Sequence, residues 1–145
     1  MYASALLSVF LPLLVVTASP SARTTTLKVT YDNTYDNPTG SLNTVACSNG
    51  KNGLVTKGFT DFQSLPSFPY IGGAQAVASW NSTNCGTCWG LTYNGKTINV
   101  LAIDTAANGF NIAQEALDAL TDNQAVQLGF VEATVVEVDP HKCGF

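Results

Sequence analysis

The sequence contains few charged residues and a single histidine. Asp, Glu, Lys and Arg make up 11% of its 145 residues, and ten acids against six bases give a net charge of −4. Nucleic-acid binding needs a basic face that displaces counterions from phosphates, so this composition argues against that class of partner. One histidine and the lack of a second Cys-x-x-Cys pair leave a tetrahedral zinc site short of ligands. We therefore expect no nucleic-acid partner, no metal and no cofactor.

No apolar run in the sequence is long enough to cross a bilayer. The run Ala5–Val16 is too short for a mature transmembrane helix, and Ser, Pro, Arg and Thr follow it instead of a stop-transfer pattern. The small residues Val16-Thr17-Ala18 are typical of a signal-peptidase site, although no Lys or Arg precedes the run. We predict a signal peptide at 1–18, a flexible arm at 19–26 and one domain at 27–145. The protein is then secreted, extracellular or in the cell wall, without a membrane span; a buried N-terminal helix is the alternative.

Four cysteines, Cys47, Cys85, Cys88 and Cys143, follow the predicted signal peptide. An even count in a secreted chain indicates disulfides, for which three pairings exist. A redox role for the Cys85-Gly-Thr-Cys88 motif is disfavoured because the strand-like pattern "WGLTY" follows it. A helix in that place would supply the dipole that stabilises a thiolate. We therefore predict that the cysteines are structural.

Alternating apolar and β-branched residues predict a mainly β fold. The segment "WGLTYNGKTINVLAI" contains Asn94-Gly95, which suits a type I′ turn and therefore a hairpin. Further strands are predicted at 27–33, 44–47 and 130–138. A helix is predicted at 113–122, with Glu115, Asp118 and Asp122 on its solvated face, and a shorter helix or turn at 60–65. The residues alone indicate a mainly β barrel or sandwich.

Five stretches occur in a diagnostic order: "VTYDNTYDN", "SLNTVACSNGKNGL", "FPYIGGAQAVASWNSTNCGTCWGLTYNGK", "VLAIDTAANGFNIAQEALDAL" and "PHKCG". Together they run from about Val29 to Gly144 and resemble the cerato-platanin family of small secreted fungal proteins. The resemblance implies a six-stranded double-psi β-barrel with one or two short helices, the barrel shared with barwin-like proteins and expansins. It also implies two disulfides, Cys47–Cys85 and Cys88–Cys143.

The resemblance further implies a function without catalysis. It implies binding of N-acetylglucosamine oligomers, as in chitin, without hydrolysis, together with expansin-like loosening of polysaccharides and elicitation of plant defences. One alternative is a surface-active or self-assembling elicitor that acts through a plant protein receptor independently of sugar. Another is a weak glycoside hydrolase. Other cell-wall polysaccharides are further candidate partners, and we expect a monomer or weak self-association.

The stretch "VLAIDTAANGFNI" places Asp104 after an apolar run and Asn111 seven residues later. Inverting polysaccharide hydrolases need one carboxyl group to donate a proton and a second to activate water. In the related expansin barrels the second aspartate lies in a His-Phe-Asp-like triplet, where this chain has Gly109-Phe110-Asn111. A carboxamide cannot donate and retrieve that proton, so we predict that the protein is not an enzyme. The sequence leaves open that Asp32 or Asp36 approaches Asp104 instead.

The same polar residues are candidates for sugar recognition, because amides and ionised acids make directed hydrogen bonds to hydroxyls. Asp104 is the first candidate, and its alternative role is an Asx-turn that closes the strand. Asn111 is the second, and its alternative is a capping box with Gln114. The resemblance adds residues that otherwise belong to a turn or a strand end: Ser48, Asn49, Gly50, Tyr31 and Asp32.

Aromatic side chains stack on sugar faces, which makes six of them candidates: Trp80, Trp89, Tyr35, Phe59, Phe62 and Phe110. The alternation of Trp89 with Leu91 and Tyr93 predicts a core position, whereas the pattern assigns nothing to Trp80. No evenly spaced aromatic row is present, which favours short soluble oligomers over crystalline polysaccharide. Asn81-Ser82-Thr83 is the one N-glycosylation sequon, so Asn81 is a candidate glycan site.

Overall fold

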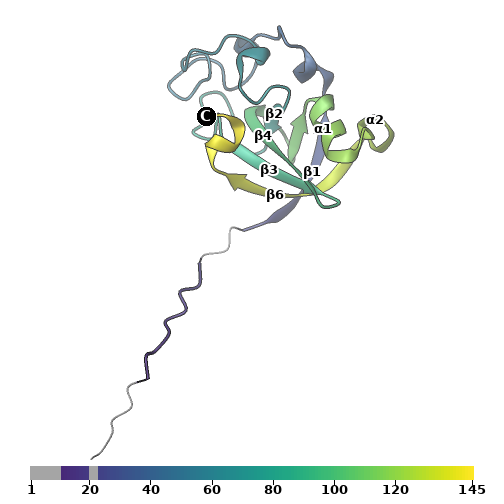
Figure 1. Ribbon diagram of the computed structural model, residues 1–145. Coiled ribbons are helices and arrows are strands. Elements are labelled where there is room, and N and C mark those ends of the chain that lie inside the picture. Colours follow the sequence, from purple (N-terminus) through teal and green to yellow (C-terminus); the bar gives the residue numbers. More distant parts are fainter. Residues whose placement is uncertain (1–10, 20–22) are drawn as a thin grey trace, which may run out of the picture.

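Six strands close into a barrel in the computed structural model, which describes residues 11–19 and 23–145 (Figure 1). The strands are β1 (Thr25–Tyr31), β2 (Ile71–Ala74), β3 (Cys88–Tyr93), β4 (Lys96–Thr105), β5 (Phe110–Ile112) and β6 (Phe130–Val138). Their order around the barrel is β1-β5-β2-β4-β3-β6. Two short helices, α1 (Gln114–Thr121) and α2 (Ala125–Leu128), follow β5. The predicted mainly β, six-stranded barrel is confirmed.

The hairpin is the best predicted element. β3 and β4 pair antiparallel from Cys88 opposite Leu101 to Tyr93 opposite Lys96. Asn94 and Gly95 join them with positive φ values of 47° and 77°, as a type I′ turn requires. The strand predicted at 130–138 is β6 with the same bounds.

The predicted disulfides Cys47–Cys85 and Cys88–Cys143 are both present. The first ties the long segment between β1 and β2 to the loop before β3, and the second ties the start of β3 to the 3₁₀ helix η4 (Pro140–Cys143). No cysteine is left free in the described part of the chain. All four side chains are buried, so the crosslinks are part of the core.

Helix α1 begins and ends one residue inside the predicted range 113–122. Its buried stripe of Ala116, Leu117 and Leu120 packs against the barrel. Of the three acids predicted on the solvated face, Glu115 and Asp122 are exposed. Asp118 is half-buried, and its Oδ1 accepts a hydrogen bond from the backbone N–H of Ala125 at 2.9 Å, which caps α2. The prediction for Asp118 was therefore wrong, because α2 folds back onto it.

Three other sequence predictions meet a different local structure. The strand predicted at 44–47 was wrong, because residues 45–47 form a loop. The apolar pattern there reflects burial of Val45 and Cys47, whose segment bonds to the end of β4 by single contacts. β1 starts at Thr25 and so includes the last two residues of the predicted arm, and it ends at Tyr31. The short helix predicted at 60–65 is the 3₁₀ helix η3 (Phe62–Ser64).

The N-terminal predictions lie partly outside the described residues. Residues 1–10 of the predicted signal peptide and residues 20–22 of the predicted arm are in the part that is not described. Residues 11–19 are exposed and have no helix or strand. In the described part of the chain, no helix combines the length and apolar composition needed to cross a membrane. The division into signal peptide and arm stays a prediction.

Candidate functional site

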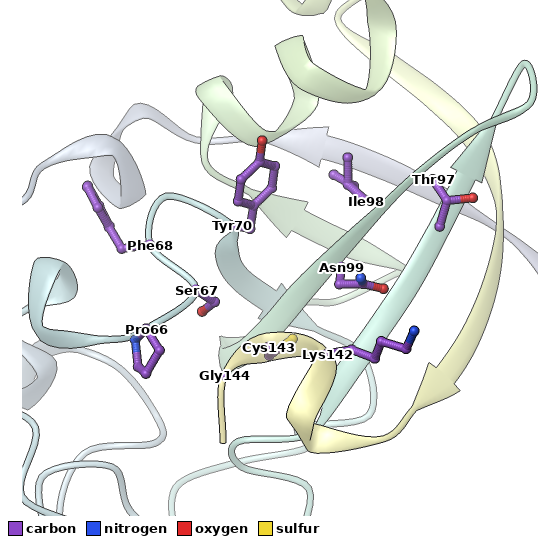
Figure 2. Close-up of a pocket in the computed structure, with 10 residues that line it drawn as sticks. All are labelled: Pro66, Ser67, Phe68, Tyr70, Thr97, Ile98, Asn99, Lys142, Cys143 and Gly144. Atoms are coloured by element: carbon purple, nitrogen blue, oxygen red, sulfur yellow. The ribbon is translucent and has the colours of Figure 1, made fainter.

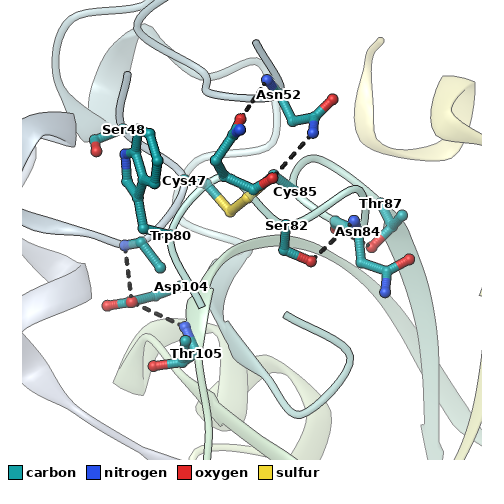
Figure 3. Close-up of a disulfide and its surroundings, with 12 residues drawn as sticks. Cys47, Ser48, Asn52, Trp80, Ser82, Asn84, Cys85, Thr87, Asp104 and Thr105 are labelled. Carbon is teal, nitrogen blue, oxygen red and sulfur yellow. Dashed lines mark hydrogen bonds between the residues drawn. A yellow bond between two sulfur atoms is a disulfide. The ribbon is translucent and has the colours of Figure 1, made fainter. Parts of the chain in front are cut away.

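Asp104, near the end of β4, accepts three hydrogen bonds from the protein itself. Its Oδ1 accepts from the backbone N–H of Ala46 at 3.0 Å and of Thr105 at 2.8 Å (Figure 3), and its Oδ2 accepts from the Tyr35 hydroxyl at 3.0 Å. The Thr105 bond comes from the next residue, so Asp104 does not close an Asx-turn. A carboxylate has about four acceptor positions. The half-buried Asp104 therefore holds the 45–47 loop on β4 and retains acceptor capacity for about one ligand hydroxyl.

The contact with Asp104 changes the pKa of Tyr35. This tyrosine is buried and belongs to the 3₁₀ helix η1 (Asn33–Asp36). Burial raises the pKa of the Tyr35 hydroxyl above its ordinary value of 10.0, and the negative charge of Asp104, its hydrogen bond and the charge of Asp32 raise the pKa further. The neutral hydroxyl is therefore the form that the fold stabilises. That form is also the hydrogen-bond donor that Asp104 requires.

Replacing Tyr35 with phenylalanine tests this coupling through the pH dependence of stability. A raised pKa in the folded state contributes stability that is complete below pH 10 and is lost as the pH rises above it. We expect Tyr35→Phe to lower the free energy of unfolding by about 1–2 kcal/mol at pH 7. We also expect it to flatten the alkaline loss that wild type shows above pH 10, measured by urea unfolding. The control Tyr93→Phe should show the same alkaline loss of stability as wild type. An equal loss above pH 10 in all three proteins would contradict the coupling between Tyr35 and Asp104.

Neither of the two acids left open as partners of Asp104 is paired with it. Both oxygens of Asp36 accept backbone N–H bonds at 2.9 Å, from Gln114 and Glu115, so Asp36 caps α1 across the structure. Asp32 is exposed and its Oδ1 accepts from the Thr34 N–H at 2.8 Å, which caps η1. In the described chain the buried polar side chains are Ser48 and Thr121, and neither is an acid.

Asn111 lies in the middle of β5, which rules out its alternative role in a capping box with Gln114. The position before α1 is Ala113, and Asp36 does the capping instead. The Asn111 Oδ1 accepts from the Thr30 hydroxyl of β1 at 2.9 Å, which leaves its Nδ2 free to donate. Asn111 and Thr30 line an open hollow of 360 Å³ together with Lys28, Thr105 and Asn108. Asn111 and Asp104 both stand opposite Gly73 of β2, so they lie two strands apart.

The segment Ser48-Asn49-Gly50 follows the first disulfide and supports a neighbouring tryptophan. Ser48 is buried, whereas Asn49 is exposed and its Oδ1 accepts from the indole Nε1 of Trp80 at 2.7 Å. Gly50 has a φ of 86°, and a Cβ there would lie 3.0 Å from the Trp80 ring and 2.8 Å from the Oδ1 of Asn81. Glycine at position 50 is thus what lets the indole lie close to this turn.

Trp80 is the candidate that sequence reasoning left unassigned. Its side chain is 58% exposed, although the indole is held by Asn49. The other five aromatic candidates are all more buried: Tyr35, Phe62 and Phe110 lie in the core, and Phe59 and Trp89 are half-buried. Trp89 packs edge-on against Phe110 with ring centres 5.7 Å apart, so it lies against the core but stays half-buried, where the alternation predicted a core position. No periodic signal marks Trp80, because its exposure depends on how the loops fold together.

The remaining predicted residues have clear local positions. Tyr31 ends β1 and is half-buried, and Asp32 follows it. The Asn81 Oδ1 accepts from the Asn52 backbone N–H at 2.9 Å, so this side chain helps to hold the loop around Trp80. Glycosylation of Asn81 stays a prediction. No group of three or more His, Cys, Asp or Glu side chains that could hold a metal ion occurs in residues 11–19 and 23–145.

The structure therefore arranges the candidates in two clusters. Asp104, Tyr35 and Asp32 form one, beside Asn111; Asn49 and Gly50 form the other, with Trp80 and Asn81. The 45–48 segment joins them, because the N–H groups of Ala46 and Cys47 bond to Asp104 and to the carbonyl of Ile103. The Cys47–Cys85 disulfide anchors this connection (Figure 3).

These features define a small, disulfide-linked β-barrel protein with a polar surface built on the ends of its strands and on long loops. The cerato-platanin family model matches residues 27–145, and the chain belongs to the cerato-platanin family. It is 54% identical to the allergen Asp f 15 of Aspergillus fumigatus over 117 residues, which cover 81% of this chain and 76% of that protein.

Solved structures show the same fold. The crystal structure of cerato-platanin 3 from M. perniciosa is 46% identical, with a TM-score of 0.81, and the match covers 83% of this chain and all of that one. The solution structure of the fungal elicitor cerato-platanin is 36% identical, with a TM-score of 0.71 over 80% of this chain and 95% of that one. An expansin of Clavibacter michiganensis shares the fold alone, at 18% identity and a TM-score of 0.52 over 81% of this chain and 51% of that one. The predicted double-psi barrel is confirmed.

Proposed function

We propose that this protein is a secreted carbohydrate-binding protein that recognises N-acetylglucosamine oligomers without cutting them. Trp80 is the observation that carries the proposal. Its exposed indole offers a flat apolar face on which a pyranose ring can stack, and the bond to Asn49 holds that face in place before a ligand arrives. An exposed aromatic side chain that is already ordered loses little entropy on binding.

Polar groups in both clusters can supply the hydrogen bonds that such a sugar needs. The Nδ2 groups of Asn49 and Asn111 remain available as donors, because the bonds that these residues make use their Oδ1 atoms. Asp104 offers about one further acceptor position. Donors suit the acetamido carbonyl of N-acetylglucosamine, and the acceptor suits a ring hydroxyl. Chitin oligomers are therefore the favoured ligand, with other cell-wall polysaccharides as further candidates.

The positions of the acids support binding without hydrolysis. Both oxygens of Asp36 accept backbone N–H bonds from α1, so this acid caps the helix and is not paired with Asp104 as a second catalytic acid. Asn111 occupies the position where an expansin-like second acid would stand, and a carboxamide does not exchange that proton. We expect no reducing ends to be released from chitin or cellulose, and measurable release would support the hydrolase alternative.

Titration with an N-acetylglucosamine tetramer tests sugar binding by NMR. The chain has two tryptophans, so its two indole N–H signals form a matched pair. We expect the Trp80 signal to shift and the signal of the half-buried Trp89 to stay. Trp80→Ala should weaken binding about tenfold, as loss of a stacking contact worth about 1.4 kcal/mol does. Wild-type protein that shows no shifts at millimolar sugar would rule out the proposed ligand.

A second candidate function is elicitation through a protein receptor. The apolar side chains of Val126, Leu128 and Phe130 are exposed within one short segment, at 60%, 39% and 47%. Such a patch favours contact with another protein or weak self-association. The similar solved structure is that of a fungal elicitor, which adds support. A leaf response to Trp80→Ala equal to that of wild type would favour the receptor; a lost response would make elicitation depend on sugar.

Polysaccharide loosening is an outcome of the same binding surface. Separating glycan chains requires contacts that compete with those between the chains, and it requires no bond cleavage. We expect wild type to weaken cellulose paper mechanically while Trp80→Ala does so less. Equal weakening by both proteins would separate loosening from the Trp80 surface.

A further inference from the structure

Within residues 11–19 and 23–145, one half of β4 has no strand partner on one side. β3 pairs with β4 over residues 96–101, but β2 pairs with β4 only from Leu101 to Thr105. The first bond on the β2 side runs from the Leu101 N–H to the Tyr70 carbonyl. Before Tyr70 the chain turns away, with the Tyr70 N–H bonded to the Ser67 carbonyl at 2.7 Å. Residues 97–99 therefore form a free edge in an otherwise closed barrel.

The direction of the backbone groups on this edge follows from the register. In an antiparallel pair, hydrogen-bonded and non-hydrogen-bonded residue pairs alternate. Residues two apart in a strand therefore direct their backbone groups to the same side. Leu101 directs its N–H toward Tyr70 and away from β3, so the N–H and C=O groups of Asn99 and Thr97 also point away from β3. These groups repeat every second residue, about 6.8 Å apart, which is the repeat of an extended peptide.

The free edge opens into a hollow of 450 Å³ (Figure 2). One side is formed by Thr97 and Asn99 of β4, another by the 66–70 segment and a third by the end of η4. Ser67 is part of this lining, but its Oγ is buried and has no hydrogen-bond partner in the described chain, so a ligand in the hollow meets the other polar groups instead. The hollow starts about 17 Å along β4 from Asp104, as five residues of strand span. It is separate from the proposed sugar surface.

The charge of the hollow is of one sign. Lys142 is the one charged side chain in its lining, and its ammonium group makes no ion pair with the described residues. The nearest acid along the chain, Asp139, is bonded to His141 by both the backbone N–H and the ring. Those bonds lower the pKa of the Asp139 carboxyl, and the charge of Lys142 adds a smaller effect in the same direction, so Lys142 is near this acid without forming an ion pair with it. A protein with a net charge of −4 thus has a groove without a carboxylate.

We propose that the free edge of β4 binds an extended peptide segment that carries an acidic side chain. The peptide adds a short strand beside Thr97 and Asn99, and a Glu or Asp side chain approaches Lys142. The 66–70 segment, with the half-buried rings of Phe68 and Tyr70, forms the opposite wall and contacts the apolar side chains of the peptide. Backbone groups supply the register and Lys142 supplies the preference for acidic sequences. This proposal does not depend on sugar binding.

Backbone pairing is tested with a peptide and a matched analogue. The probe is acetyl-Val-Glu-Val-Glu-Val-amide, added to ¹⁵N-labelled protein. We expect the amide signals of Thr97 and Asn99 to shift and their hydrogen exchange to slow. The analogue methylated on the alternate peptide nitrogens that face β4 cannot donate to the edge and should bind at least tenfold more weakly. Equal binding of both peptides, or no change at Thr97 and Asn99, overturns the proposal.

The preference for acidic sequences is tested by reversing one charge. Lys142→Glu should bind the glutamate peptide about fivefold more weakly and should favour acetyl-Val-Lys-Val-Lys-Val-amide instead. Lys57→Glu makes the same change of net charge away from the hollow and should bind like wild type. Both variants should keep the wild-type melting temperature. Binding of galacturonate oligomers at Thr97 and Asn99 in preference to the peptide would make this an acidic-saccharide site and also overturns the proposal.

Discussion

Replacing Cys88 and Cys143 with serine is expected to lower the free energy of unfolding by about 4 kcal/mol, and the melting temperature by roughly 15 °C. The Cys88–Cys143 disulfide joins residues 55 positions apart, so removing it restores much chain entropy to the unfolded state. The Cys47–Cys85 crosslink spans 38 positions and should contribute a similar amount. Calorimetry of the double-serine variants and of the reduced wild type measures both effects.

The two crosslinks should differ in what else they affect. Cys47–Cys85 anchors the loop that carries Asn49 to the segment after Trp80, so its removal should weaken sugar binding as well as stability. Cys88–Cys143 lies at the start of β3 and should leave sugar binding unchanged below the lowered melting temperature. A melting temperature that moves by less than about 3 °C on reduction would show that the barrel core alone accounts for the stability.

Replacing Gly109 with alanine is expected to destabilise the fold by more than about 3 kcal/mol. Gly109 has a φ of 62°, and a Cβ built on it would lie 2.0 Å from the Lys28 carbonyl oxygen of β1. The Gly109 N–H donates to the Oε1 of Gln75, just after β2, and the Gly109 carbonyl accepts from the Gln75 backbone N–H. These two bonds fix the position of Gly109 between β1 and β2. The added methyl group can be accommodated only if β5 moves away from β1. Urea unfolding measured by circular dichroism gives the change in free energy.

Gly95 provides the matched control for this substitution. Its φ of 77° is equally unfavourable for alanine, but no atom lies within 4 Å of the position that a Cβ would occupy. Gly95→Ala should therefore lower the free energy of unfolding by only about 1 kcal/mol, which is the cost of placing alanine at a positive φ. If both variants lose the same free energy of unfolding, the added methyl group at position 109 does not clash with Lys28. Close packing against β1 would then not be the reason that position 109 requires glycine.

Elements set by local interactions were predictable from the sequence. The Asn94-Gly95 turn, the alternating strand at 130–138 and the apolar stripe of α1 each follow from residues close together in the chain. The segment 44–47 shows the limit of that reasoning. Its β-branched and apolar residues look like a strand, yet Thr44 ends a 3₁₀ helix and residues 45–47 form a loop. The N–H groups of Ala46 and Cys47 each donate one hydrogen bond to the end of β4, which satisfies them without a strand ladder.

The candidate site was predictable only in part. Asp104 stands out because it ends an apolar run. Asn111 stands out because it replaces an acid in a motif. Their partners are far away in sequence: Tyr35 lies 69 residues from Asp104, and Thr30 lies 81 residues from Asn111. Trp80 has no pattern of its own, since its exposure results from the way the Ser48-Asn49-Gly50 turn supports the ring edge.

The sequence by itself determined the composition class, the disulfide-linked secreted character that we predict, the hairpin, the main helix and membership of a family. Only the tertiary structure decided that Asp36 caps α1 and that Asp104 is largely engaged with Tyr35 and Ala46. It also decided that residues 97–99 of β4 have no strand partner on one side among the residues that the structure describes. The physical reason is range. Turns and periodic faces depend on a few adjacent residues, whereas the partner of a carboxylate or of a strand edge depends on how segments far apart in the chain pack together.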